Sequence, residues 1–156
     1  MADALPPETA KQQIESLKAF TADLELSVRK VAKGYGTRPV QVSELKKWLD
    51  DALVSNTDAA IRPREGMTNA PYLTGNVNRD VLSKLLTQVK ARVTELESGK
   101  VEPKEPVKQW LVTQLSDAAA SKVMVPGMKG GDTRPASAEE VKGWLGGKSW
   151  VDEGGY

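Results

Sequence analysis

The sequence predicts an all-α fold of two helical hairpins followed by a third short helix, and three observations support this. Apolar residues recur every three or four positions over long stretches, which is the period of an amphipathic helix. A signature of an aliphatic residue, lysine, any residue, tryptophan and leucine occurs three times, and a recurring pattern marks a reused structural unit. Alternating polar and apolar residues, which are typical of strands, do not stand out. We therefore expect one helical domain over residues 1–156.

The first expected element is a long helix from Glu8 to Lys33. Pro6 and Pro7 lie just before it, where proline suits the start of a helix. Gly34 is placed to end it as a left-handed cap. Its apolar stripe consists of Ile14, Leu17, Phe20, Leu24, Val28 and Val31.

The remaining elements repeat this order of a long helix and a short tryptophan helix. A shorter helix carries Trp48, a second long helix ends at Gly99, and another short helix carries Trp110. A shift along the chain that superposes Trp48 on Trp110 also superposes Val31 on Val93. The last helix is short and carries Trp144, and Ser137 with Glu140 fits a capping box at its start.

Two copies of the signature belong to a longer repeat. Residues 37–49 and 133–145 align without a gap, and both begin with Thr-Arg-Pro and end with Trp-Leu. Core packing explains the tryptophan and the leucine, but it does not explain the arginine. Because the residue before a proline is held extended, we expect Arg38 and Arg134 to project beside the helix start and to bond a carboxylate or backbone carbonyls. Chance similarity over so short a window is the alternative.

Two segments do not fit the helical pattern. Residues 55–77 form a predicted irregular loop, and residues 146–156 form a predicted C-terminal arm. Long irregular segments in a small domain are usually binding loops or arms, and exposed aromatic residues anchor interfaces. The predicted protein-contacting residues are Met67, Tyr72, Leu73, Trp144, Trp150 and Tyr156. Packing in the core of the chain itself is the alternative for Trp144.

The composition argues against several classes of function. The chain has no cysteine and no histidine, so disulfides, thiolate metal sites and histidine bases are excluded. Neither a serine nucleophile elbow nor a complete phosphate-binding loop is present. We therefore expect a protein that is not an enzyme and that binds no cofactor or metal. No apolar run is long enough to span a membrane, and the first residues do not resemble a signal peptide, which predicts a cytoplasmic origin.

Charge is balanced overall but not locally. The formal net charge is +1, which argues against a general polyanion binder. Six bases nevertheless gather between positions 29 and 47, namely Arg29, Lys30, Lys33, Arg38, Lys46 and Lys47. Such a cluster can contact nucleic acid or an acidic protein, or it can be a solvated helix end, because cations are favoured in a last helical turn.

Two resemblances bear on function. Residues 40–49 resemble the first helix of SAP-type helix-extension-helix modules, which implies nucleic-acid binding. More broadly, a short, nearly neutral chain without cysteine and with terminal arms is similar to the small helical accessory proteins of tailed-phage and other viral particles. That resemblance implies a non-enzymatic structural or adaptor protein of the virion, such as a cement, connector or internal capsid protein, with other subunits as partners. A small helical nucleic-acid-binding protein that uses the basic cluster is the alternative.

Overall fold

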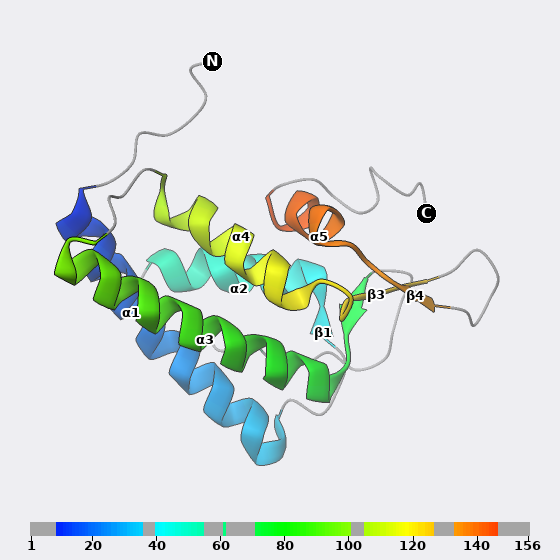
Figure 1. Cartoon of the computed structure of the whole chain (residues 1–156). Helices are drawn as coiled ribbons and strands as arrows, with labels where there is room; N and C mark the ends of the chain where they lie inside the picture. The colour runs from blue at the N-terminus through cyan, green and yellow to red at the C-terminus, as the bar shows by residue number, and fades with distance from the viewer. Residues whose placement is uncertain are drawn as a thin grey trace.

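The chain is mostly helical, with a small sheet at one end of the helices (Figure 1). The computed structural model describes residues 9–35, 40–54, 61, 71–100, 105–126 and 133–146. Helices account for 78% of the described residues. The helices are α1 (Ala10–Lys30), α2 (Val42–Val54), α3 (Gly75–Ser98), α4 (Val107–Ala119) and α5 (Ala138–Leu145), and a π turn, η1 (Val31–Tyr35), extends α1.

The sheet corrects the expectation of a purely α-helical fold. Four strands pair antiparallel in the order β1-β2-β3-β4. They are β1 (Val40–Gln41), β2 (Tyr72–Leu73), β3 (Met124–Pro126) and β4 (Thr133–Pro135). Strands of two or three residues are too short to show the alternation that identifies a strand in a sequence. These segments are strands because they pair with neighbouring strands, and their own sequence pattern does not identify them.

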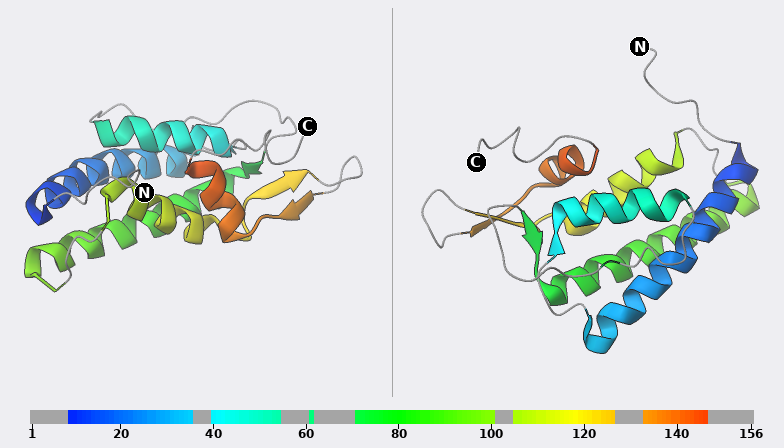
Figure 2. Two further views of the ribbon diagram at one scale, coloured as in Figure 1. Left: turned by 90° about the horizontal axis from the view of Figure 1, so that it is seen from above. Right: turned by 180° about the vertical axis from the view of Figure 1, so that it is seen from behind.

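The two long helices, α1 and α3, pack against each other along their length and run in opposite directions (Figures 1 and 2). Two ion pairs fix this direction. Lys18 Nζ lies 2.8 Å from Glu97 Oε2, and Lys90 Nζ lies 2.9 Å from Glu25 Oε2. A step of seven residues forward along α1 therefore corresponds to seven residues backward along α3. The expected hairpin neighbours α1–α2 and α3–α4 also touch, but the pairing of the long helices was not foreseen.

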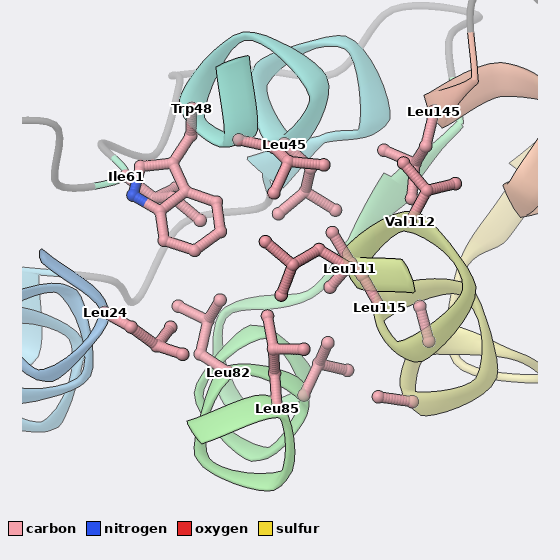
Figure 3. Close-up of a cluster of buried hydrophobic side chains, with 14 of the residues drawn as sticks. Leu24, Leu45, Trp48, Ile61, Leu82, Leu85, Leu111, Val112, Leu115 and Leu145 are labelled. Carbon is pink, nitrogen blue, oxygen red and sulfur yellow. The ribbon is translucent and has the colours of Figure 1, made fainter. Parts of the chain in front are cut away.

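One continuous hydrophobic cluster joins the elements. Figure 3 shows Leu45 of α2, Leu85 of α3 and Leu111 of α4 pointing toward one another. The predicted apolar stripe of the first helix supplies Leu17, Phe20, Leu24 and Val31 to this core, whereas Ile14 and Val28 are only partly buried at its margin. Phe20 of α1 contacts Trp48 of α2, with ring centroids 5.2 Å apart. Burial of this kind is the main favourable term in folding.

Part of the segment that was expected to be irregular is built into the fold. Ile61 is 4% exposed, and its backbone N–H donates to Ser27 Oγ of α1 at 3.4 Å. Tyr72 and Leu73 form β2, and Thr74 caps α3, which begins at Gly75. The prediction of a loop as far as residue 77 is therefore wrong at its end, because Asn76 and Val77 already belong to a helix. Residues 55–60 and 62–70 lie outside the described part.

Four helix ends test the predictions of where helices begin and end. Gly99 ends α3, as expected, and its conformation is left-handed, with φ +77°. Ser137 and Glu140 form the predicted capping box of α5. Gly34 does not end the first helix, because the π turn carries the helical path through it to Tyr35. At the start of α1 the capping box is formed by Thr9 with Gln12, where the sequence analysis relied on Pro6, Pro7 and Glu8.

Replacement of Gly99 by alanine should destabilise the chain by about 1 kcal/mol, because a side chain in the left-handed region clashes with its own backbone. No other atom lies within 4 Å of the position that the added Cβ would take, so packing strain should add nothing. Gly99→Asn is the matched control and should lose less, since asparagine tolerates this conformation. Urea denaturation followed by circular dichroism measures both. Equal losses for the two variants would contradict a conformational cause.

Candidate functional site

The long sequence repeat is also a structural repeat. In both copies a tryptophan helix follows a short strand, β1 before α2 and β4 before α5. The two strands do not occupy the same position of the repeat, because β1 aligns with residues 136–137, whereas β4 aligns with residues 37–39, which lie outside the described part. The two strands form the two edges of the sheet, and the two helices pack against each other. Equivalent residues are buried alike: Trp48 and Trp144 are 3% and 7% exposed, and Leu49 and Leu145 have no exposed surface. The similarity therefore extends to the burial of the two tryptophan helices.

The acidic residue shared by the two copies has the same contact in each. Glu44 Oε2 accepts the backbone N–H of Gln41 at 3.0 Å. Glu140 Oε1 accepts the backbone N–H of Ser137, also at 3.0 Å. In each case a glutamate reaches back three residues to a backbone N–H that has no partner within the helix. The repeat thus reuses one way of starting a helix.

Arg134 confirms half of the expectation about the Thr-Arg-Pro segment. Its guanidinium binds both carboxylate oxygens of Glu140, with Nη1–Oε1 at 3.2 Å and Nη2–Oε2 at 3.0 Å. It also donates to the backbone carbonyl of Pro135 at 3.3 Å. Arg38, the equivalent residue, lies outside the described residues, so its role stays a prediction.

The Arg134–Glu140 pair strongly affects the ionisation of the carboxylate. Hydrogen bonds from the Arg134 side chain and then from the Ser137 backbone N–H lower the pKa of Glu140 from 4.5 to about 2. Strongly shifted groups are often catalytic. Here the two causes of the shift tie β4 to α5 and cap the helix, so a structural task accounts for it.

The third copy of the signature, in α4, is placed differently. Trp110 is only partly buried, and the Arg92 guanidinium carbon lies 5.3 Å from the centroid of its ring. Trp110 is therefore less buried than Trp48, which holds the same position in the first copy of the signature. The sequence offered no sign that Arg92, on a different helix, would cover one face of the indole.

The predicted protein-contacting residues fall into three groups. Met67, Trp150 and Tyr156 lie outside the described residues. Tyr72 is half-buried in β2. Leu73 and Trp144 are 0% and 7% exposed, so their assignment as partner contacts is corrected: both side chains are buried in the hydrophobic core of this chain. The alternative that the sequence analysis left open for Trp144 is the one that the structure supports.

The predicted basic cluster is divided by the fold. Arg29 and Lys30 lie in the last turn of α1, and Lys33 lies in the π turn that follows. Lys46 and Lys47 lie on α2, where Lys47 Nζ is 2.9 Å from Asp51 Oδ2. That helix also carries Glu44, Asp50 and Asp51, so its acids outnumber its bases. Arg38, between the two groups, is outside the described residues. Lys46 and Lys47 therefore lie on a different helix from the cations at the end of α1.

Two further observations concern sites that the composition made improbable. Within the described ranges, no group of three or more acidic side chains is arranged to hold a metal ion. None of the described helices has the length and apolar character needed to cross a membrane. Four of the ion pairs among the described residues join one element to another, namely Lys18–Glu97, Lys90–Glu25, Lys108–Asp50 and Arg134–Glu140.

Loss of the Glu140 charge should destabilise the chain in a pH-dependent way. A carboxylate with a lowered pKa stabilises the fold above the unfolded-state pKa of about 4.5, and this contribution is lost as the pH falls toward about 2. Because the Glu140 side chain is 35% exposed, solvent screening reduces the effect to about 1 kcal/mol. Glu140→Gln should show that loss at pH 7 in urea denaturation.

The difference between wild type and Glu140→Gln should shrink steadily between pH 4.5 and pH 2. Glu139→Gln, at the neighbouring exposed position, is the matched control and should change stability little at any pH. A loss in Glu140→Gln that does not depend on pH would show that the pair does not stabilise the fold through its charge.

Replacement of Trp144 by alanine should cost about 3–5 kcal/mol of unfolding free energy, because a large buried side chain is removed and a cavity remains. Trp110→Ala is the matched comparison and should cost less, since Trp110 is only partly buried. Chemical denaturation of the two variants measures the difference. If Trp144→Ala left stability unchanged while Trp110→Ala lowered it, the burial of Trp144 in this chain would be refuted.

Comparison of the chain with protein-family models, with curated proteins and with solved structures finds no match. A function for this chain therefore rests on its own residues and geometry.

Proposed function

We propose that this chain is a non-enzymatic structural or adaptor protein that acts within a larger assembly, and that this assembly is a virion. In that setting the chain serves as a capsid-associated cement, connector or internal protein. The helical core is a platform, and the segments around Met67, Trp150 and Tyr156 contact neighbouring subunits.

The observation that carries this proposal is the position of four ion pairs, which join different helices and strands. Lys18 with Glu97 and Lys90 with Glu25 join α1 to α3, and each pair lies within 2.9 Å. Lys108 Nζ lies 2.7 Å from Asp50 Oδ1 and joins α4 to α2. Arg134 and Glu140 join β4 to α5. Charged groups of an active site converge on a reacting atom, whereas these pairs brace the fold from several sides.

The repeat supports the same function. A binding repeat would present its two tryptophans to partners, but Trp48 and Trp144 are both buried, and their helices pack on each other. The repeated unit is therefore used to build the platform. The virion setting rests on the resemblance in size, composition and arms to viral accessory proteins.

Sedimentation of the native full-length chain tests the proposal. In gradients of a lysate in which the chain is made at its natural level, we expect it to travel with large particles at a fixed ratio to other proteins. A chain that remains at the top of the gradient as a free monomer would contradict the proposal.

Variants then test which segments make the contacts. Met67→Ala, Trp150→Ala and Tyr156→Ala together should release the chain from the particles, because aromatic and methionine side chains anchor interfaces. The melting temperature should not change if these residues lie outside the core. Lys11→Ala, Lys100→Ala and Lys122→Ala, at exposed positions, form the control and should stay with the particles. Release by the control set alone would oppose the assigned contacts.

A further inference from the structure

Cationic side chains from two distant parts of the sequence lie at one end of the α1–α3 pair. This is the end at which α1 finishes and α3 begins. The ion pairs Lys18–Glu97 and Lys90–Glu25 show which residues of α1 lie opposite which residues of α3. The same antiparallel register continues beyond these pairs toward the π turn. That turn packs against α3, and Figures 1 and 2 show the last turn of α1 beside the first turns of α3. Lys33, in the π turn, therefore lies alongside the beginning of α3.

Helical phase and the packing of the π turn place three of these cations along one seam. Arg29 follows Glu25 by one turn of α1 and so continues the line of side chains that faces α3. Lys33 lies beyond it, in the π turn that packs against α3. Arg79 precedes Glu97 by about five whole turns of α3, so it lies on the side of α3 that faces α1. Arg29, Lys33 and Arg79 are all exposed. We call this group the basic seam.

The basic seam differs from the rest of the α1–α3 contact in its charge balance. Lys18 and Lys90 are each matched by a glutamate on the opposite helix. Among the described residues, Arg29 and Lys33 make no ion pair. Arg79 has Asp80 beside it at 3.7 Å, with both side chains about half exposed, and such a surface pair contributes little. Positive charge is therefore left unbalanced at this end.

The alternative explanation is that these cations belong to a solvated helix end, and it accounts for the residues of α1 but not for Arg79. Cations at the carboxyl end of α1 are favoured by the helix dipole, which covers Arg29 and Lys30. The same dipole argument disfavours a cation near the amino end of a helix, and Arg79 lies in the second turn of α3. The first turn of α3 contains no acidic residue to offset it.

We propose that the basic seam of Arg29, Lys33 and Arg79 contacts the phosphate backbone of nucleic acid. Phosphate contacts need exposed cationic side chains and little apolar burial. Interfaces with proteins instead use aromatic anchors and are poor in lysine, whereas Ala32, next to Lys33 in the chain, and Asn76, one turn before Arg79, are exposed and are small or polar. This contact is additional to the structural function and independent of it, since the sedimentation experiment can succeed or fail without it.

Fluorescence anisotropy of a labelled DNA duplex with the full-length chain tests the proposal. Three phosphate contacts predict that the affinity falls with a log–log slope of about −2.7 in salt, or about 40-fold between 50 and 200 mM. Arg29→Gln, Lys33→Gln and Arg79→Gln should each reduce the slope by about 0.9. The triple glutamine variant should lose the salt-dependent binding while keeping its circular dichroism spectrum and melting temperature.

A matched triple variant controls for net charge. Lys11→Gln, Lys100→Gln and Lys122→Gln remove the same charge from exposed positions away from the seam, and they should leave affinity and slope as in wild type. Equal loss in both triple variants would overturn the proposal, because net charge alone would then explain binding. Absence of duplex binding by the wild-type chain at 20 mM salt would overturn it as well, and so would tighter binding of poly-L-glutamate than of the duplex, which would assign the seam to an acidic protein.

Discussion

The antiparallel packing of α1 against α3 is the contact on which the rest of the structure depends. These are the two longest helices, and their buried faces contribute residues such as Leu17, Leu24, Leu82 and Leu85 to the hydrophobic cluster. Apolar burial supplies the stability, but it does not distinguish one direction from the other. The complementary pairs Lys18–Glu97 and Lys90–Glu25 match only when the helices run in opposite directions. Once this pair is formed, α2 and α4 have a surface to cover, and the end of α1 is brought beside the beginning of α3.

The strand–helix repeat closes the other side of the core. Because β1 and β4 are the two edges of an antiparallel sheet, the helices that follow them can meet, and α2 packs against α5. In each copy a helix begins shortly after a strand, and a glutamate that reaches back three residues, Glu44 or Glu140, accepts a backbone N–H at the start of that helix. Recurrence of this chemistry in one chain therefore reflects a shared structural requirement, and the buried tryptophans complete the contact with the core.

Structural features that depend on residues close together in the sequence could be predicted. The apolar period located the helices, Gly99 ended α3 as a left-handed cap, and Ser137 with Glu140 capped α5. Features that depend on distant contacts could not. The strands are too short to have a pattern of their own, and Ile61 is buried in the core with its N–H bound to Ser27 of α1, which is distant in the sequence. Trp110 has the same signature as Trp144, but Arg92 on α3 covers it while Trp144 is buried. The basic cluster was drawn from one continuous stretch, whereas the fold sets Lys46 and Lys47 on a helix with more acids than bases and brings Arg79 from another helix.

Native-state hydrogen exchange tests most directly whether this is one platform built around the α1–α3 pair. Amides in the middle of α1, α2, α3 and α4 should open with a single free energy, equal to the free energy of global unfolding, because one hydrophobic cluster joins all four helices. Elements that open independently give lower values. Two groups of amides with distinct free energies, one for α1 with α2 and another for α3 with α4, would show two separate hairpins and would contradict the account.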